Sequence, residues 1–78
     1  MLSTIIDEGY ILSNKFRRVI FDELSSGEKD LQHIIKKHRL IKRVAQHIID
    51  EFISGGIVTK KGSLFYLTEE GEKLATKI

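Results

Sequence analysis

Apolar residues recur every three or four positions through the first two thirds of the chain, which is the spacing of amphipathic helices. This pattern predicts four helical stretches that share one core. Their apolar positions are Leu2, Ile5, Ile6, Tyr10 and Leu12 in the first, Phe16, Val19, Ile20, Phe21 and Leu24 in the second, Leu31, Ile34 and Ile35 in the third, and Ile41, Val44, Ala45, Ile48, Ile49 and Phe52 in the fourth.

Polar residues that cap helices precede these stretches. Thr4 followed by Asp7 has the spacing of a capping box, in which each side chain binds the free backbone amide of the other residue. Either Ser13 or Asn14 offers an N-cap for the second helix, and Asp30 offers one for the third. The first three helices are therefore expected to begin at or near these residues.

The third and fourth apolar sets do not lie on one helical stripe. A short turn at residues 38–40 therefore fits better than a single helix of 24 residues over 31–54. Gly27 is a natural stop for the second helix, because glycine readily takes the left-handed conformation that ends helices.

The last third of the chain changes to a strand pattern. Two short β-rich runs, 57–60 and 64–67, flank a turn at 61–63 that contains Gly62, which predicts a hairpin. Thr68 then caps a final helix with Leu74, Ala75 and Ile78 facing inward. The predicted fold class is mostly α with a small β-hairpin.

The length of 78 residues supports one hydrophobic core, which rules out an enzyme with a cleft between two lobes. Without cysteine the chain has no thiolate zinc site and no thiol nucleophile. The longest apolar run has four residues, too few to span a membrane, and no signal-peptide pattern is present. We expect a cytoplasmic, nucleoid-associated protein that has no cofactor and is not an enzyme.

The charge is distributed unevenly along the chain. The net charge of +2 divides into −2 for residues 1–28, +5 for 29–61 and −1 for 62–78. A basic block between acidic ends favours an anionic partner, most often nucleic acid.

Several motifs occur in register over some 60 residues. They are the apolar helix Phe16–Leu24, the capped segment from Gly27 to Ile35, the segment Ala45-Gln46-His47-Ile48-Ile49 with Phe52 and Gly56-Ile57-Val58, and Phe65-Tyr66-Leu67-Thr68-Glu69-Glu70-Gly71. Together they resemble the winged helix-turn-helix domain of small bacterial and archaeal transcription regulators of the MarR/ArsR-like type. The resemblance implies a three-helix core in residues 13–78, a recognition helix at about 41–54 and a wing at 57–67.

Three residues depart from the family pattern at the turn. Arg39 occupies a position where the family usually has glycine, and Ile41 stands where serine or threonine normally caps the recognition helix. His38 lies at a commonly apolar position. These departures concern the geometry of the turn more than the fold.

The outward residues of the fourth helix can be assigned DNA contacts on chemical grounds. Arginine and lysine pair with guanine, and glutamine pairs with adenine, in the major groove. The expected base-reading residues are Arg43, Gln46, Lys42 and His47, and the expected phosphate-binding residues are Lys36, Lys37, Arg39, Lys60 and Lys61. A surface ion pair between His47 and Asp50 is also expected.

Residues 1–12 are an N-terminal segment with two interpretations. They pack on the domain as an extra helix, or they contact a second chain in a homodimer, which is the arrangement we favour because small DNA readers usually bind two half-sites. Sequence-specific binding of double-stranded DNA is the leading expectation. The alternatives are a winged-helix module that binds protein partners and a non-specific architectural DNA-binding protein.

Overall fold

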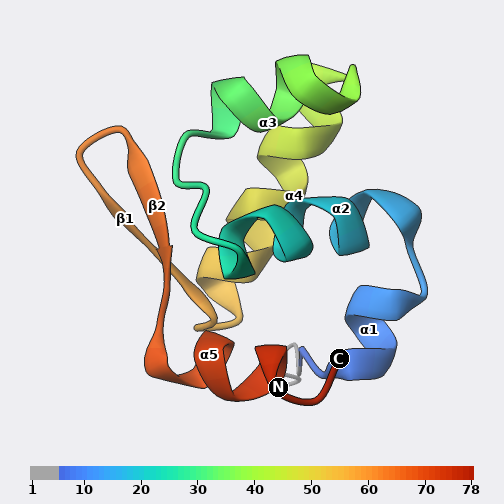
Figure 1. Cartoon of the computed structure of the whole chain (residues 1–78), viewed down its shortest axis with the longest axis vertical. Coiled ribbons are helices and arrows are strands. Elements are labelled where there is room, and N and C mark those ends of the chain that lie inside the picture. Colours follow the sequence, from blue (N-terminus) through green and yellow to red (C-terminus); the bar gives the residue numbers. More distant parts are fainter. Residues whose placement is uncertain (1–5) are drawn as a thin grey trace.

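The computed structural model describes residues 6–78, and this part of the chain contains five helices and a two-stranded antiparallel hairpin (Figure 1). The fold class predicted from the sequence, mostly α with a small hairpin, is confirmed at this level. The elements are α1 (Glu8–Leu12), α2 (Lys15–Ser25), α3 (Leu31–His38), α4 (Lys42–Ser54), β1 (Val58–Lys61), β2 (Leu64–Leu67) and α5 (Glu69–Ala75).

Side-chain caps determine where most helices begin. Asn14, Asp30 and Thr68 accept backbone N–H groups in the first turns of α2, α3 and α5, as predicted. The first helix differs from the prediction, because it begins at Glu8 with Asp7 itself as the N-cap, accepting from the Tyr10 N–H at 2.9 Å. Thr4, the other half of the expected capping box, lies outside the described residues, as do Leu2 and Ile5.

Helix α3 ends in a tight turn, as the change of apolar phase predicted. The Leu40 N–H donates to the Ile35 carbonyl at 2.9 Å, and the Arg39 N–H donates to the Lys36 carbonyl at 3.4 Å. This is the Schellman arrangement, which requires a left-handed residue. Arg39 takes that conformation, with φ 53° and ψ 47°. Glycine would do so without the strain of about 1 to 2 kcal/mol that an L-residue incurs.

The core lies between the five helices and the base of the hairpin. At its centre the rings of Phe21 and Phe52 meet edge to face, with centroids 6.2 Å apart. Each large apolar side chain buried here contributes about 1.5 to 3 kcal/mol to folding. The buried residues are Ile11, Ile20, Phe21, Leu24, Leu31, Ile34, Ala45, Ile48, Ile49, Phe52, Ile57, Val58, Phe65 and Leu74.

Some predicted inward positions are wrong. In the first helix Ile11, which the sequence pattern did not select, is fully buried, and Leu12 is 44% exposed. The short α1 packs against α2, so its inward face is one position out of phase with the expected one. Ile41 is 64% exposed because it is the extended N-cap of α4 and not part of its helical face. Phe16 and Ile78 are also exposed, since Phe16 lies in the first turn of α2 and Ile78 lies beyond the end of α5.

The hairpin has a shorter turn than predicted. Lys61 pairs with Leu64 as part of β1, and Gly62 and Ser63 alone form the connection. Gly62 has φ 64°, and a positive φ confined to the first central residue is typical of a type II′ turn. Ile57, predicted as the first strand residue, precedes β1.

Further hydrogen bonds attach the hairpin to the helices. The Phe65 N–H donates to the Lys29 carbonyl at 2.9 Å, so the loop before α3 extends the open edge of β2. At the base of the hairpin, the Thr68 N–H donates to the Ile57 carbonyl at 3.0 Å, and its hydroxyl donates to the Gly56 carbonyl at 2.6 Å. The hairpin tip and α3 lie towards one end of the molecule, and α5 lies at the other (Figure 1).

Candidate nucleic-acid interface

Helix α4 presents a polar face opposite its buried one. Ala45, Ile48, Ile49 and Phe52 are buried, whereas Gln46, His47 and Asp50 between them are exposed and Glu51 is half-buried. Because residues three and four positions apart share one helical face, the exposed side chains form one continuous surface. This surface is a shallow groove lined by Lys42, Arg43, Gln46, His47 and Asp50. All four predicted base-reading residues are therefore brought together.

The hairpin shares a second groove with this helix. Gln46 from α4 and Lys60 from β1 both line it, together with Asp30, Leu31, Gln32, Ser63 and Phe65. Two side chains that are 14 positions apart in the sequence thus face one depression. An extended anionic ligand that lies along α4 at Gln46 would also reach the inner face of the hairpin.

The two lysines of the hairpin lie on opposite faces. Lys60 is the register partner of Phe65 and shares its inner face, and the Lys60 ammonium lies 5.8 Å from the Phe65 ring centroid. Lys61 lies on the outer face, since side chains alternate along a strand. Its ammonium is 5.5 Å from the ring centroid of Tyr66.

Lys29 is a basic residue of this surface that the sequence analysis did not assign to DNA. Its ammonium lies 5.5 Å from the Tyr66 centroid, the same separation as that of Lys61, and donates to the Gly27 carbonyl at 3.0 Å. The hydrogen bond from Phe65 to the backbone of Lys29 brings it there. The outer face of the hairpin therefore carries two cations around one aromatic ring, at distances at which the ring attracts both of them.

The end of α3 contributes a third group of cations. Lys36 and Arg39 are exposed, and neither forms an ion pair within residues 6–78. Lys37 behaves differently, because its ammonium lies 3.0 Å from the Glu23 carboxylate of α2. The same carboxylate oxygen is 2.6 Å from Nε2 of His38. Hydrogen bonds from His38 and then Lys37 hold the pKa of Glu23 below its ordinary value, so this carboxylate is charged at neutral pH.

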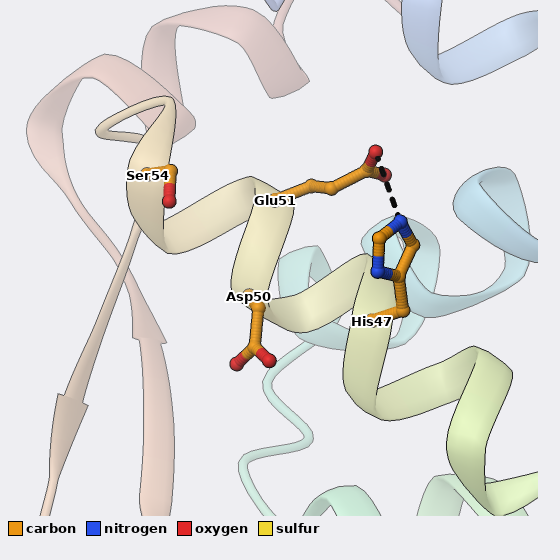
Figure 2. A pocket seen from close by; sticks show the side chains of 4 residues that line it. All are labelled: His47, Asp50, Glu51 and Ser54. Carbon is orange, nitrogen blue, oxygen red and sulfur yellow. Dashed lines mark ion pairs between the residues drawn. The ribbon is translucent and has the colours of Figure 1, made fainter.

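The C-terminal half of α4 carries two acidic side chains, Asp50 and Glu51, and both contact residues one turn earlier in the helix (Figure 2). His47 Nε2 lies 3.5 Å from Glu51, whereas Asp50 accepts from the Gln46 amide at 3.0 Å. The predicted pairing of His47 with Asp50 is therefore wrong, because the i, i+4 carboxylate is the one that His47 meets. His47, Asp50, Glu51 and Ser54 line a small pocket here.

Glu51 also faces the interior. Its other oxygen lies 3.7 Å from Nε of Arg17 in α2, and the Arg17 guanidinium stacks 3.8 Å from the ring centroid of Tyr10 in α1. Burial, followed by the neighbouring Glu51 carboxylate, raises the pKa of the Tyr10 phenol. This contact network joins three helices behind the polar face of α4 and bounds the basic surface on that side.

Within residues 6–78 no group of three or more histidine, aspartate or glutamate side chains could hold a metal ion. Three surface depressions in these residues belong to the polar face of α4 and the groove that it shares with the hairpin. In the same residues no helix is long and apolar enough to cross a membrane.

The chain was compared with protein families, curated proteins and solved structures, and none of them matches it.

Proposed function

We propose that this chain is a winged helix-turn-helix protein that binds double-stranded DNA with sequence preference and regulates transcription. One observation carries the proposal most directly: Gln46 of α4 and Lys60 of the hairpin line one groove. A helix that lies in the major groove and a hairpin that reaches the adjoining backbone would contact the duplex from one such surface.

The residues divide by role. Arg43 and Gln46 are placed on the exposed first half of α4, where helices that enter the major groove usually read bases. Lys42 and His47 flank them. Lys36, Lys37, Arg39, Lys60 and Lys61 are phosphate contacts in this proposal, and Lys29 joins them from the loop before α3. Phosphate contacts fix the register of the protein on the duplex without specifying sequence.

The arrangement of acidic residues supports one binding orientation. Glu72 of α5 lines a pocket together with Lys29 and Tyr66, whereas Glu69 and Glu70 begin α5, at the end of the molecule opposite α3 and the hairpin tip (Figure 1). A duplex bound along α4 and the hairpin tip would avoid Glu69 and Glu70. This separation explains how a chain with a net charge of only +2 can bind a polyanion.

Selection of bound duplexes from a random pool tests this function. A preferred site should emerge, and Arg43→Ala combined with Gln46→Ala should reduce preference for it by at least about tenfold, because each bidentate base contact supplies about 1 to 3 kcal/mol of discrimination. Lys77→Ala, in the exposed C-terminal residues, is the matched control and should keep the preference. A protein-binding module would enrich nothing from the pool, and an architectural protein would bind every duplex alike.

The proposal includes a homodimer, because two half-sites are the usual target of small DNA readers. Leu12 and Phe16, both more than 40% exposed at the junction of α1 and α2, are apolar positions available to a second copy. Leu12→Glu should convert a dimer to a monomer in analytical ultracentrifugation and leave the circular dichroism unchanged. Sedimentation of the wild-type chain as a monomer would contradict the dimer.

A further inference from the structure

The turn between α3 and α4 is held from outside by one side chain of α2. The Glu23 carboxylate, only 13% exposed, receives both of the last two residues of α3: Nε2 of His38 at 2.6 Å and Nζ of Lys37 at 3.0 Å. Within the described residues, no other carboxylate forms ion pairs with two neighbours from a different helix.

The turn that follows is closed by backbone hydrogen bonds but lacks the residue types that usually favour it. Arg39 is the only residue other than glycine with a positive φ in residues 6–78. Two positions later Ile41, the N-cap of α4, supplies no side-chain cap. Glycine in the turn and serine or threonine at the cap would have favoured this geometry. The contact of Glu23 with Lys37 and His38 adds support from outside to a turn whose own residue types do not favour it.

The contact acts on the residues proposed to meet DNA. His38 is followed directly by Arg39, and α4 with Lys42 and Arg43 starts three residues beyond Arg39. Fixing the end of α3 against α2 therefore fixes the point from which α4 leaves. A misplacement of about 1 Å in such an element is enough to spoil polar recognition.

We infer that Glu23 and His38 are positioning residues for sequence recognition: their contact sets the exit of α4 and so the fit of Arg43 and Gln46 to the base edges. This inference rests on the proposed DNA binding. In this inference Arg43 and Gln46 contact the base edges in the major groove of the duplex. Glu23 and His38 do not contact the DNA themselves.

The inference predicts an effect opposite to that of charge alone. Glu23→Gln removes a negative charge, so a purely electrostatic role would raise affinity for every duplex. A positioning role lowers affinity for the selected site relative to random duplex, by about tenfold, within the range found for residues that couple to a site without touching the ligand. Glu70→Gln, on α5, makes the same change in charge at an exposed pair with Lys73 and serves as the control.

Two variants of His38 complete the test. His38→Gln places an amide donor near the position of Nε2 and should keep most of the discrimination between the selected and the random duplex. His38→Ala removes the donor and should lose as much discrimination as Glu23→Gln. The inference is overturned if Glu23→Gln changes the affinity for the selected and the random duplex equally. It is also overturned if His38→Ala keeps the full discrimination between them.

A measurement without DNA separates this inference from the proposed function. Loss of the contact should speed hydrogen exchange of the Leu40 amide, which donates to the Ile35 carbonyl across the turn. If the wild-type chain binds no duplex, the proposed function fails, and faster exchange in Glu23→Gln would leave only the structural part of the inference. Unchanged exchange together with unchanged discrimination would show that Glu23 positions nothing.

Discussion

The backbone of Phe65 and the backbone of Lys29 are joined by a hydrogen bond of 2.9 Å, although 36 positions separate them in the sequence. This bond makes the loop before α3 a neighbour of β2 and places the Lys29 ammonium beside Tyr66. The Lys29 carbonyl makes the contact with β2, whereas the side chain, which donates to the Gly27 carbonyl on the surface, makes the proposed DNA contact. The two roles can therefore be separated by substitution.

Lys29→Ala should leave the free energy of unfolding within about 0.5 kcal/mol of wild type, as is usual for surface substitutions. It should reduce the dependence of log affinity for duplex DNA on log salt by about 0.9, the value for one phosphate contact. Titrations at several salt concentrations measure this slope. Lys77→Ala is the control, and a Lys29→Ala slope that matches it would remove Lys29 from the interface.

Arg39 has two roles that oppose each other. Its left-handed backbone is strained, and its side chain is proposed to contact phosphate. Arg39→Gly should raise the free energy of unfolding by about 1 kcal/mol, because glycine adopts φ 53° freely, and should weaken duplex binding. Urea unfolding of this variant measures the expected increase in stability, and DNA titration measures the expected loss of affinity. Lower stability would show that Arg39 makes a stabilising contact, and unchanged affinity would show that its side chain does not bind phosphate.

Two helical glycines should respond differently to alanine. A Cβ on Gly71 would lie 2.2 Å from the Ile57 carbonyl oxygen, so Gly71→Ala has to displace α5 from the base of the hairpin. Overpacking of this kind costs about 1 to 3 kcal/mol. A Cβ on Gly9 in α1 would lie 3.5 Å from its nearest neighbour, an oxygen of Asp7. Gly9→Ala should therefore stabilise the fold by up to about 1 kcal/mol. Thermal unfolding of both variants measures the contrast, and equal shifts would contradict the packing of α5 described above.

Acid should destabilise the fold through two glutamates. The pKa of Glu23 is lowered by hydrogen bonds from His38 and Lys37, and the pKa of Glu28 is lowered by the Asp30 N–H and by His33. A carboxyl with a lower pKa in the folded chain stabilises it above the ordinary value of 4.5, and this contribution is lost as pH falls through the lower folded value.

Urea unfolding between pH 7 and pH 3 measures this loss. Glu23→Gln should show a smaller decrease in stability over that interval than wild type does, since it has one titrating contact fewer. Glu70→Gln is the control. An identical decrease in wild type and Glu23→Gln would show that the contact between Glu23 and His38 contributes nothing to stability.

Local signals in the sequence predicted most of the elements. Caps such as Asp30 and Thr68 act within four residues, and the apolar period of α4 determines which of its side chains are exposed. Short or terminal elements were predicted less well. In α1, five residues are too few to define a helical phase, so the apolar spacing favours Leu12 over Ile11, which is the buried residue.

Contacts between distant elements account for what the sequence could not predict about the site. No local pattern indicates that Lys29 meets Tyr66 or that Glu23 reaches His38, because both contacts depend on how whole elements pack. The pairing of His47 with Glu51 was also missed, since Asp50 and Glu51 are both within helical reach of His47 and only the rotamers decide. A basic residue immediately before the capping Asp30 was the one signal that could have singled out Lys29.

The most direct test of the central claim is a titration of the wild-type chain with double-stranded DNA at increasing salt. If the six cations Lys29, Lys36, Lys37, Arg39, Lys60 and Lys61 contact phosphates, log affinity should fall linearly with log salt, with a slope of about −5 per bound copy. Absence of duplex binding at about 50 mM salt, or a slope near zero, would contradict the account.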